Sequence, residues 1–328
     1  METKNSLSPE SQDSPAQTES PRIKIVPVPV WMKAIPFFLS GTLFLSGFFA
    51  WLAPFPLLLF RIRAPFWMAM LAFLSNAFLV RILAGPSSLS IYGIVVGVLM
   101  LTIPSLLERR VSVARTGMIA WVAVTLVALA AIATDSMLHG STLLKQWSGQ
   151  VDGMVQLLTQ ELPAESRFEF FGVSDAEEIK TIILREMPSG FLVVILAVIW
   201  ANLTLLLNAN PFGIRNGLGL GRDFFRNFKV SEYWVWPSIA FGIGWLLVPE
   251  TALNGWVSVV SANGVRVMMA LYLIQGISIL SFFLDVWKIA GFFRWVVFGM
   301  VFAFMMPVIV TAGFFDLWFD FRSKLRQS

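Results

Sequence analysis

The sequence predicts an all-α integral membrane protein: a polytopic helical bundle of about eight transmembrane helices with a small extramembrane helical insert. Of its 328 residues, 57% are hydrophobic and only 13% are charged, whereas soluble domains carry about 25% charged residues. The mean hydropathy is +0.74. A soluble fold of this length could not cover so much apolar surface, so lipid must be the solvent for much of the chain.

The chain is expected to begin with a disordered polar tail over residues 1–30. This segment is rich in Ser, Pro, Gln and Glu and has almost no apolar periodicity before Ile23. It lacks the short apolar core and small-residue cleavage site of a signal peptide, so the first hydrophobic segment is expected to remain as an anchor.

Eight apolar runs follow, and each is a candidate span of the bilayer, which takes roughly 20 apolar residues to cross. They lie at about 34–60, 65–84, 88–107, 114–137, 189–208, 234–249, 265–287 and 292–317. Residues 31–137 therefore hold spans one to four and residues 189–322 hold spans five to eight, before a basic tail at 323–328. The first and last runs contain prolines and exceed a simple crossing. Each is either one long kinked helix or a crossing plus a re-entrant piece.

The sizeable polar insert, residues 138–188, separates the two halves. Apolar residues recur at helical spacing from 141 to 162, which predicts an amphipathic helix that Pro163 ends. The capping-box pattern at 174–177 predicts the start of a second helix. At about 50 residues the insert is too small to hold much core alone, so a helical pair lying on the bundle or the membrane surface is favoured over an independent domain.

Lys and Arg in the short loops predict the orientation of the spans. One face collects Arg61, Arg63, Arg109, Arg110, Arg115, Arg215, Arg222, Arg226, Lys229, Lys288 and Arg294. The other face has Arg266 and the insert, which carries four basic residues against eight acidic ones. We therefore expect the first face in the cytoplasm and the insert outside. Eight simple spans would put both basic termini outside, and re-entrant geometry in the first and last runs would resolve that conflict.

Polar groups within spans are the candidate ligand-binding residues, because burying them unpaired in hydrocarbon is costly. They are Asn76, Arg81, Asn202 and Gln275. For Arg81, near a helix end, snorkelling to the interface is the competing interpretation. For Asn202 and Gln275 it is hydrogen bonding across helices.

The C-terminal stretch holds two carboxylates one helical turn apart, Asp316 and Asp320, followed by Arg322. Like charges at this spacing repel, which suggests a cation from elsewhere in the bundle. The alternative is an interfacial anchor with solvated carboxylates. Arg222 and Arg226 lie in a Gly-rich loop that lacks the P-loop spacing, so contact with lipid headgroups or a partner is expected rather than nucleotide binding.

Several chemistries are unsupported by the sequence. There is no cysteine, and the presence of a single histidine argues against a histidine-based metal site or proton relay. No HExxH, Ser-His pairing or other catalytic pattern occurs. No catalytic residue, metal or cofactor is therefore predicted. The net charge of +4 is spread over loops and does not indicate nucleic-acid binding.

Short motifs resemble those of the YybS-like family of uncharacterised bacterial membrane proteins. They are Pro54-Phe55-Pro56-Leu57 followed by Arg61, Asp223-Phe224-Phe225-Arg226 leading to Trp234 and Pro237, Leu273-Ile274-Gln275-Gly276, and the run from Gly313 to Arg322. The family is distantly similar to the substrate-binding membrane subunits of energy-coupling-factor transporters, which work with a cytoplasmic ATPase module. The additional spans and the insert depart from that pattern.

Two functions follow as expectations for a multi-pass protein of the inner membrane. The first is a substrate-binding or transport-related subunit, with its ligand in a cavity toward the outer half. Its cytoplasmic loops at 108–115 and 213–229 would meet a partner such as an ATPase. The second is a non-transporting scaffold or accessory protein that binds an envelope partner.

Overall fold

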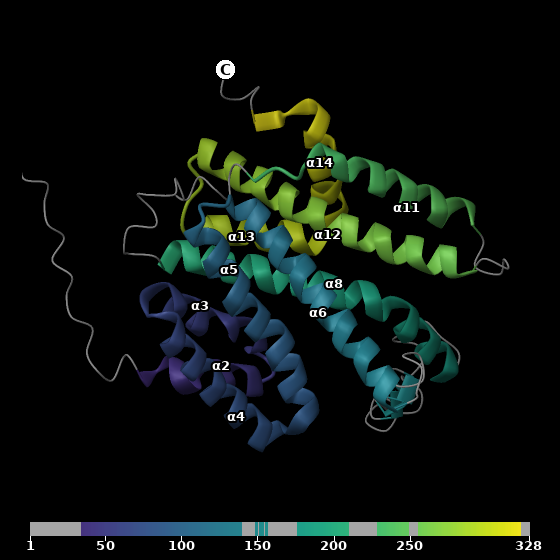
Figure 1. Ribbon diagram of the computed structural model, residues 1–328. Coiled ribbons are helices and arrows are strands. Elements are labelled where there is room, and N and C mark those ends of the chain that lie inside the picture. The colour runs from purple at the N-terminus through teal and green to yellow at the C-terminus, as the bar shows by residue number, and fades with distance from the viewer. Residues whose placement is uncertain are drawn as a thin grey trace, which may run out of the picture. The chain divides into compact units, whose positions relative to one another are not determined.

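The computed structural model describes residues 34–139, 148–149, 151–153, 155–156, 176–209, 228–248 and 255–322 (Figure 1). The regular structure in these ranges is helical and includes no strand. The chain divides into two compact units, Met1–Ile35 and Pro36–Ser328, and all of the helices below belong to the second. The prediction of an all-α membrane bundle is confirmed.

The predicted count of eight spans is not confirmed. Four helical segments of the described chain are long and apolar enough to cross a bilayer: Phe66–Glu108, Val113–Leu138, Glu177–Ala209 and Gly255–Val286. A pair of shorter helices near the C-terminus would make a fifth if it acts as one broken span. The difference arises partly because the first run is divided into short helices, and partly because the second and third runs form the single segment Phe66–Glu108, which contains a break at Gly85.

The first run is divided in this way. It forms α2 (Pro36–Leu45), the short η1 (Ala50–Leu52) and α3 (Pro54–Arg63). Gly47 has a positive φ of 67°, which ends the first helical piece. Ten residues of α-helix rise about 15 Å, roughly half of the hydrocarbon thickness. None of these pieces therefore crosses a bilayer by itself.

The segment Phe66–Glu108 contains a reversal. It comprises α4 (Phe66–Tyr92), the π-helical η2 (Gly93–Gly97) and α5 (Val98–Glu108). Gly85 has φ 84° and ψ −176°, a conformation that requires glycine, and Pro86 restarts the helix. Phe73 and Gly97 each lie 12 residues from Gly85, yet a Cβ on Gly97 would be 3.0 Å from the Phe73 ring. The chain therefore folds back at Gly85, between the apolar runs 65–84 and 88–107.

Two long helices follow and carry the main core. They are α6 (Val113–His139) and α8 (Ala176–Ala209), which pack against each other while α6 also packs against α5. Fully buried side chains at their contact include Leu99, Ile103, Leu196, Ile199 and Leu203. Helix α8 continues without interruption through Pro188. The insert and the fifth apolar run therefore share one helix.

Only part of the insert lies within the described residues, and most of the predicted 141–162 helix lies outside them. Val151 and Val155 pack against Ile179 at the start of α8. Asp152 and Lys180 form an ion pair with 2.5 Å between Oδ1 and Nζ. These contacts hold that part of the insert on α8.

The C-terminal half is built around α12 (Gly255–Val286). This helix packs against α11 (Val235–Leu247), α8 and α14 (Met306–Phe319). Helix α13 (Phe292–Phe304) meets α14 at a 97° bend, with Pro307 in the first turn of α14. No residue of α13 is buried. Because Trp295 and Phe304 are among its most exposed side chains, this surface is suited to contact with lipid.

Candidate functional site

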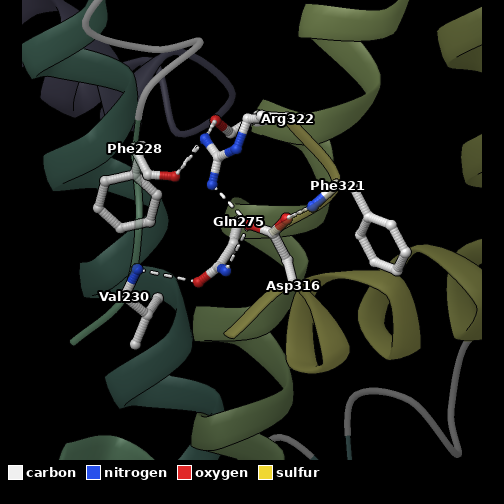
Figure 2. A network of polar contacts seen from close by, with 7 residues as sticks. Phe228, Val230, Gln275, Asp316, Phe321 and Arg322 are labelled. Carbon is white, nitrogen blue, oxygen red and sulfur yellow. Dashed lines mark hydrogen bonds and ion pairs between the residues drawn. The ribbon is translucent and has the colours of Figure 1, made fainter. Parts of the chain in front are cut away.

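A network of buried polar groups lies at the C-terminal end of α14 (Figure 2). Asp316 is fully buried and forms an ion pair with Arg322, with 2.6 Å between Oδ2 and Nη2. Its Oδ2 also accepts a hydrogen bond from Gln275 Nε2 at 3.1 Å, and its Oδ1 accepts one from the Phe321 amide at 3.0 Å. The cation beside Asp316 therefore comes from the same C-terminal segment and not from a distant part of the bundle.

The two C-terminal carboxylates do not share one environment. Asp320 has φ 41° and ends α14 in the left-handed conformation, while its own amide donates to the Asp316 carbonyl at 3.1 Å. This turn reverses the chain so that Arg322 reaches back to Asp316 (Figure 2). Asp316 is therefore fully buried within the network, whereas Asp320 is only partly buried.

The same network holds an extended segment, 228–230, against α12. Gln275 Oε1 accepts the Val230 amide at 2.9 Å. Arg322 Nη1 donates to the Phe228 carbonyl at 3.0 Å and to Ser278 Oγ at 3.3 Å. The backbone of 228–230 has no helical partners, so these side chains satisfy groups that would otherwise be buried and unpaired.

Two glycines let α12 and α14 approach closely beside this network. A Cβ on Gly276 would lie 2.1 Å from the Ile309 carbonyl oxygen, and a Cβ on Gly313 would lie 2.1 Å from the Tyr272 carbonyl oxygen. Both obstacles are backbone atoms, which cannot rotate away. Small residues at helix contacts are typical of membrane bundles.

Asn76 and Asn202 form hydrogen bonds to the backbone of the first apolar run, where its helix is interrupted. Asn76, fully buried, accepts the Gly41 amide at 2.6 Å and donates to the Pro36 carbonyl at 2.7 Å. Asn202, also fully buried, donates to the Trp51 carbonyl in η1 at 2.8 Å. Its Oδ1 has no partner among the described residues and keeps an acceptor for a ligand or a water molecule.

A further buried carboxamide, Asn263, likewise forms hydrogen bonds to backbone groups of another helix, here next to Pro188 in α8. Pro188 has no amide hydrogen and disturbs the helical ladder. The Ser189 amide donates to Asn263 Oδ1 at 2.8 Å, and Asn263 Nδ2 donates to the Arg185 carbonyl at 2.9 Å. In a regular helix that amide and that carbonyl would bond to each other. Asn263 is therefore inserted between the Ser189 amide and the Arg185 carbonyl beside Pro188.

This arrangement predicts coupling between Asn263 and Pro188. Replacing Asn263 by Leu should lower the free energy of unfolding by about 1–3 kcal/mol, because the Ser189 amide and the Arg185 carbonyl lose their partners. In a Pro188→Ala background the same change should cost clearly less, because the helix can re-form its own bond. Reversible unfolding of the four proteins in mixed micelles measures the coupling. Equal costs in both backgrounds would contradict the insertion.

The sequence-predicted ligand residues are not brought into one site. Asn76, Asn202 and Gln275 are each bonded to a different segment of the chain, and Arg81 is exposed on α4. Arg222 and Arg226 lie outside the described residues. The roles of Asn76, Arg81, Asn202 and Gln275 in ligand binding stay predictions.

A cavity suited to a small molecule lies elsewhere, between α8, α12 and α14. A cavity of about 460 Å³ is open there, lined by Glu186, Ser189, Gly190, Val193, Arg266, Met269, Ala270, Leu273, Met306, Pro307 and Val310. Glu186 and Arg266 form an ion pair at the cavity through Oε1 and Nη2, and each side chain remains 36% exposed. A smaller groove of about 330 Å³ beside η1 carries no charged group in its lining.

The cavity residues were not singled out from the sequence. Arg266 entered only as a loop charge, and Glu186 only as one of the acidic residues of the insert. Polar residues at 185–189 lie opposite polar residues at 263–266. This pairing is visible only once α8 and α12 are known to pack together. The signal available in the sequence was Pro188, which lies between the charged residues Arg185 and Glu186 and the apolar run that begins at 189.

Comparison with known proteins places this architecture in a family. A family model described as "Predicted membrane protein (DUF2232)" matches residues 33–317. The chain belongs to this family. The match covers the described helices from α2 into α14, and the family description agrees with membrane-spanning helices. No curated protein and no solved structure matches the chain.

Proposed function

We propose that the protein is a substrate-binding, transport-related membrane subunit that takes up a small molecule in the cavity between α8, α12 and α14. The observation that carries the proposal is the cavity itself. Its volume of about 460 Å³ falls in the range of about 300–1,000 Å³ that is common for small-molecule sites. It is mostly apolar and has one charged pair, which is also the usual composition of such sites.

The break before α14 supports a transport-related role. Met306 and Pro307, the first residues of α14 after the 97° bend, form part of the cavity lining. Membrane carriers commonly build their substrate sites from interrupted helices, where polar backbone groups become available. The orientation expected from the loop charges would put the Arg266 part of α12 on the outer side, so the cavity would open toward the outer half of the inner membrane.

A partner would have to supply energy if the protein transports. The sequence holds no nucleotide-binding motif, so energy would come from a cytoplasmic ATPase module or from an ion gradient. Arg61 bonds Glu108 with 2.9 Å between Nη1 and Oε1, which joins two of the predicted cytoplasmic loops into one surface for such a partner. The resemblance to the YybS-like family, and more distantly to energy-coupling-factor subunits, supports the same proposal.

A non-transporting scaffold is the second candidate. It is favoured by the use of Asn76, Asn202, Asn263 and Gln275 for internal hydrogen bonds. A protein that only presents its outer surfaces to an envelope partner needs such internal bonds and needs no cavity.

Filling the cavity separates the two functions. Gly190 lines the cavity, and a Cβ at this position would have nothing within 4 Å, so the side chain of Gly190→Leu starts in open space and adds bulk to the cavity. Gly299 on α13 is equally open and lies outside the cavity lining, so Gly299→Leu is the matched control. We expect native mass spectrometry from mild detergent to show a reproducible small-molecule adduct on the natural protein and the control, and none on Gly190→Leu.

Two results would contradict the proposal. One is a chain that carries only bulk lipid in all three proteins. The other is an adduct that persists at the same occupancy in Gly190→Leu. Co-purification of a non-ATPase envelope protein together with either result would favour the scaffold.

A further inference from the structure

We propose that the ligand of this cavity is an amphipathic anion: an aliphatic body with one carboxylate, phosphate or sulfonate group that binds Arg266. This inference rests on the proposed function and adds the chemical class of the ligand. The cavity walls indicate the body of the molecule, and the Arg266 guanidinium indicates its head.

The walls are aliphatic. Apart from the charged pair and Ser189, the lining consists of Gly, Ala, Val, Leu, Met and Pro side chains. No aromatic ring lines this cavity, although 14% of the chain is aromatic. The cavity therefore offers little for stacking a planar ring. It suits a flexible or branched aliphatic chain, against which methionine side chains adapt readily.

Arg266 retains an unused hydrogen-bond donor. Its Nη2 donates to Glu186, whereas Nη1 is buried and has no partner among the described residues. A buried guanidinium nitrogen without an acceptor is costly, and an anion is the acceptor that binds it most strongly. The Nη1 atom itself is covered, but the side chain as a whole is 36% exposed and lines the cavity, so an anion would approach the guanidinium from the cavity and bind Nη1 after a small rotation of the side chain.

The start of α14 adds to this preference for an anion. Met306 and Pro307 form the first turn of α14 and part of the cavity wall, and the helix has no side-chain cap at this end. The N-terminal end of a helix carries a partial positive charge that favours negative groups nearby. Glu186 is the opposing charge. It occupies Arg266 in the absence of ligand and therefore competes with an incoming anion.

This competition gives two substitutions opposite effects. Arg266→Gln removes the group that binds the anion, and decanoate should bind about ten- to hundredfold more weakly, as expected for loss of a charged hydrogen bond. Glu186→Gln removes the competitor, and decanoate should bind more tightly than to the natural protein. A purely structural role of the pair would weaken binding in both variants.

The experiment uses the full chain in nanodiscs of zwitterionic lipid. Decanoate, decanol and decyltrimethylammonium are titrated while binding is followed by thermal shift, for the natural protein and for Arg266→Gln, Glu186→Gln, Gly190→Leu and Gly299→Leu. We expect decanoate to bind best, Gly190→Leu to block it and Gly299→Leu to leave it unchanged. Repeating the titration with phosphatidylglycerol in the bilayer identifies the source of the anion. If phosphatidylglycerol weakens the binding of decanoate, the site belongs to an anionic lipid. If the affinity for decanoate is unchanged, the site belongs to a free amphipathic anion.

Each failure has its own meaning. Absence of decanoate binding, equal or tighter binding of decanol or the ammonium compound, or parallel weakening in Arg266→Gln and Glu186→Gln would overturn the anionic ligand. If Gly190→Leu nevertheless blocks the binding of decanol or decyltrimethylammonium, the proposed small-molecule site stands and only the anionic class of its ligand is rejected. If Gly190→Leu affects no compound, the proposed function fails as well.

Discussion

Replacing Asp316 by Asn is expected to lower the free energy of unfolding by about 3–5 kcal/mol, the usual cost of breaking a buried ion pair by removing one partner. Asp316 is fully buried and Arg322 is 6% exposed. Without the carboxylate, the buried guanidinium would lose its ion pair with Asp316. The loss should appear as a clear fall in melting temperature in mild detergent.

The neighbouring carboxylate provides the control. Asp320→Asn should change the melting temperature little, because Asp320 is only partly buried and Asn tolerates its left-handed backbone at φ 41°. The double variant Asp316→Asn/Arg322→Met should be more stable than Asp316→Asn, because it also removes the buried charge that has lost its ion pair with Asp316. Equal, small effects of Asp316→Asn and Asp320→Asn would show that both carboxylates are solvated.

A single added methyl group at Gly276 is expected to be similarly damaging. In Gly276→Ala the new Cβ would lie 2.1 Å from the Ile309 carbonyl oxygen, so α12 and α14 must separate. Overpacking usually costs about 1–3 kcal/mol. We expect at least the upper end of that range here, since the obstacle is backbone and the separation also strains the bonds around Asp316. Unfolding in mixed micelles measures the loss.

The control for this prediction is Gly299→Ala on α13. Its Cβ would meet nothing within 4 Å, and Ala is favoured over Gly within helices by about 1 kcal/mol. This variant should be as stable as the natural protein or more so. If Gly276→Ala behaved in the same way, the close contact of α12 and α14 would not exist in the folded protein.

The sequence was sufficient to predict the class of fold because composition and long apolar runs reflect the solvent around the chain. It also indicated the reversal at Gly85, where glycine and proline adjoin. It did not predict the number of spans. A helix can either bend or end at Gly47 and at the residues before Pro307. The outcome depends on packing against α4 in the first case and against α12 in the second, and both helices are separate elements of the sequence.

The polar groups show the same limit. The cost of burying amides in hydrocarbon made Asn76, Asn202 and Gln275 conspicuous, and the structure buries all three completely. Their partners were not predictable, because Asn202 bonds Trp51, 151 positions away, and Gln275 bonds Val230, 45 positions away.

The cavity was missed for the same reason. Glu186 and Arg266 lie 80 positions apart and belong to different helices. A single sequence shows each of them as an isolated charge. Only the packing of α8 on α12 brings them to one wall, and only the bend before α14 leaves space in front of them.

A structure of the protein in nanodiscs tests the proposed site most directly. We would determine it by single-particle cryo-electron microscopy for the natural protein and for Gly190→Leu. We expect ordered non-protein density between α8, α12 and α14, with its head against Arg266, and no such density in Gly190→Leu. A natural protein in which α8, α12 and α14 close together without density, or in which the density is unchanged by the leucine, would contradict a ligand site there.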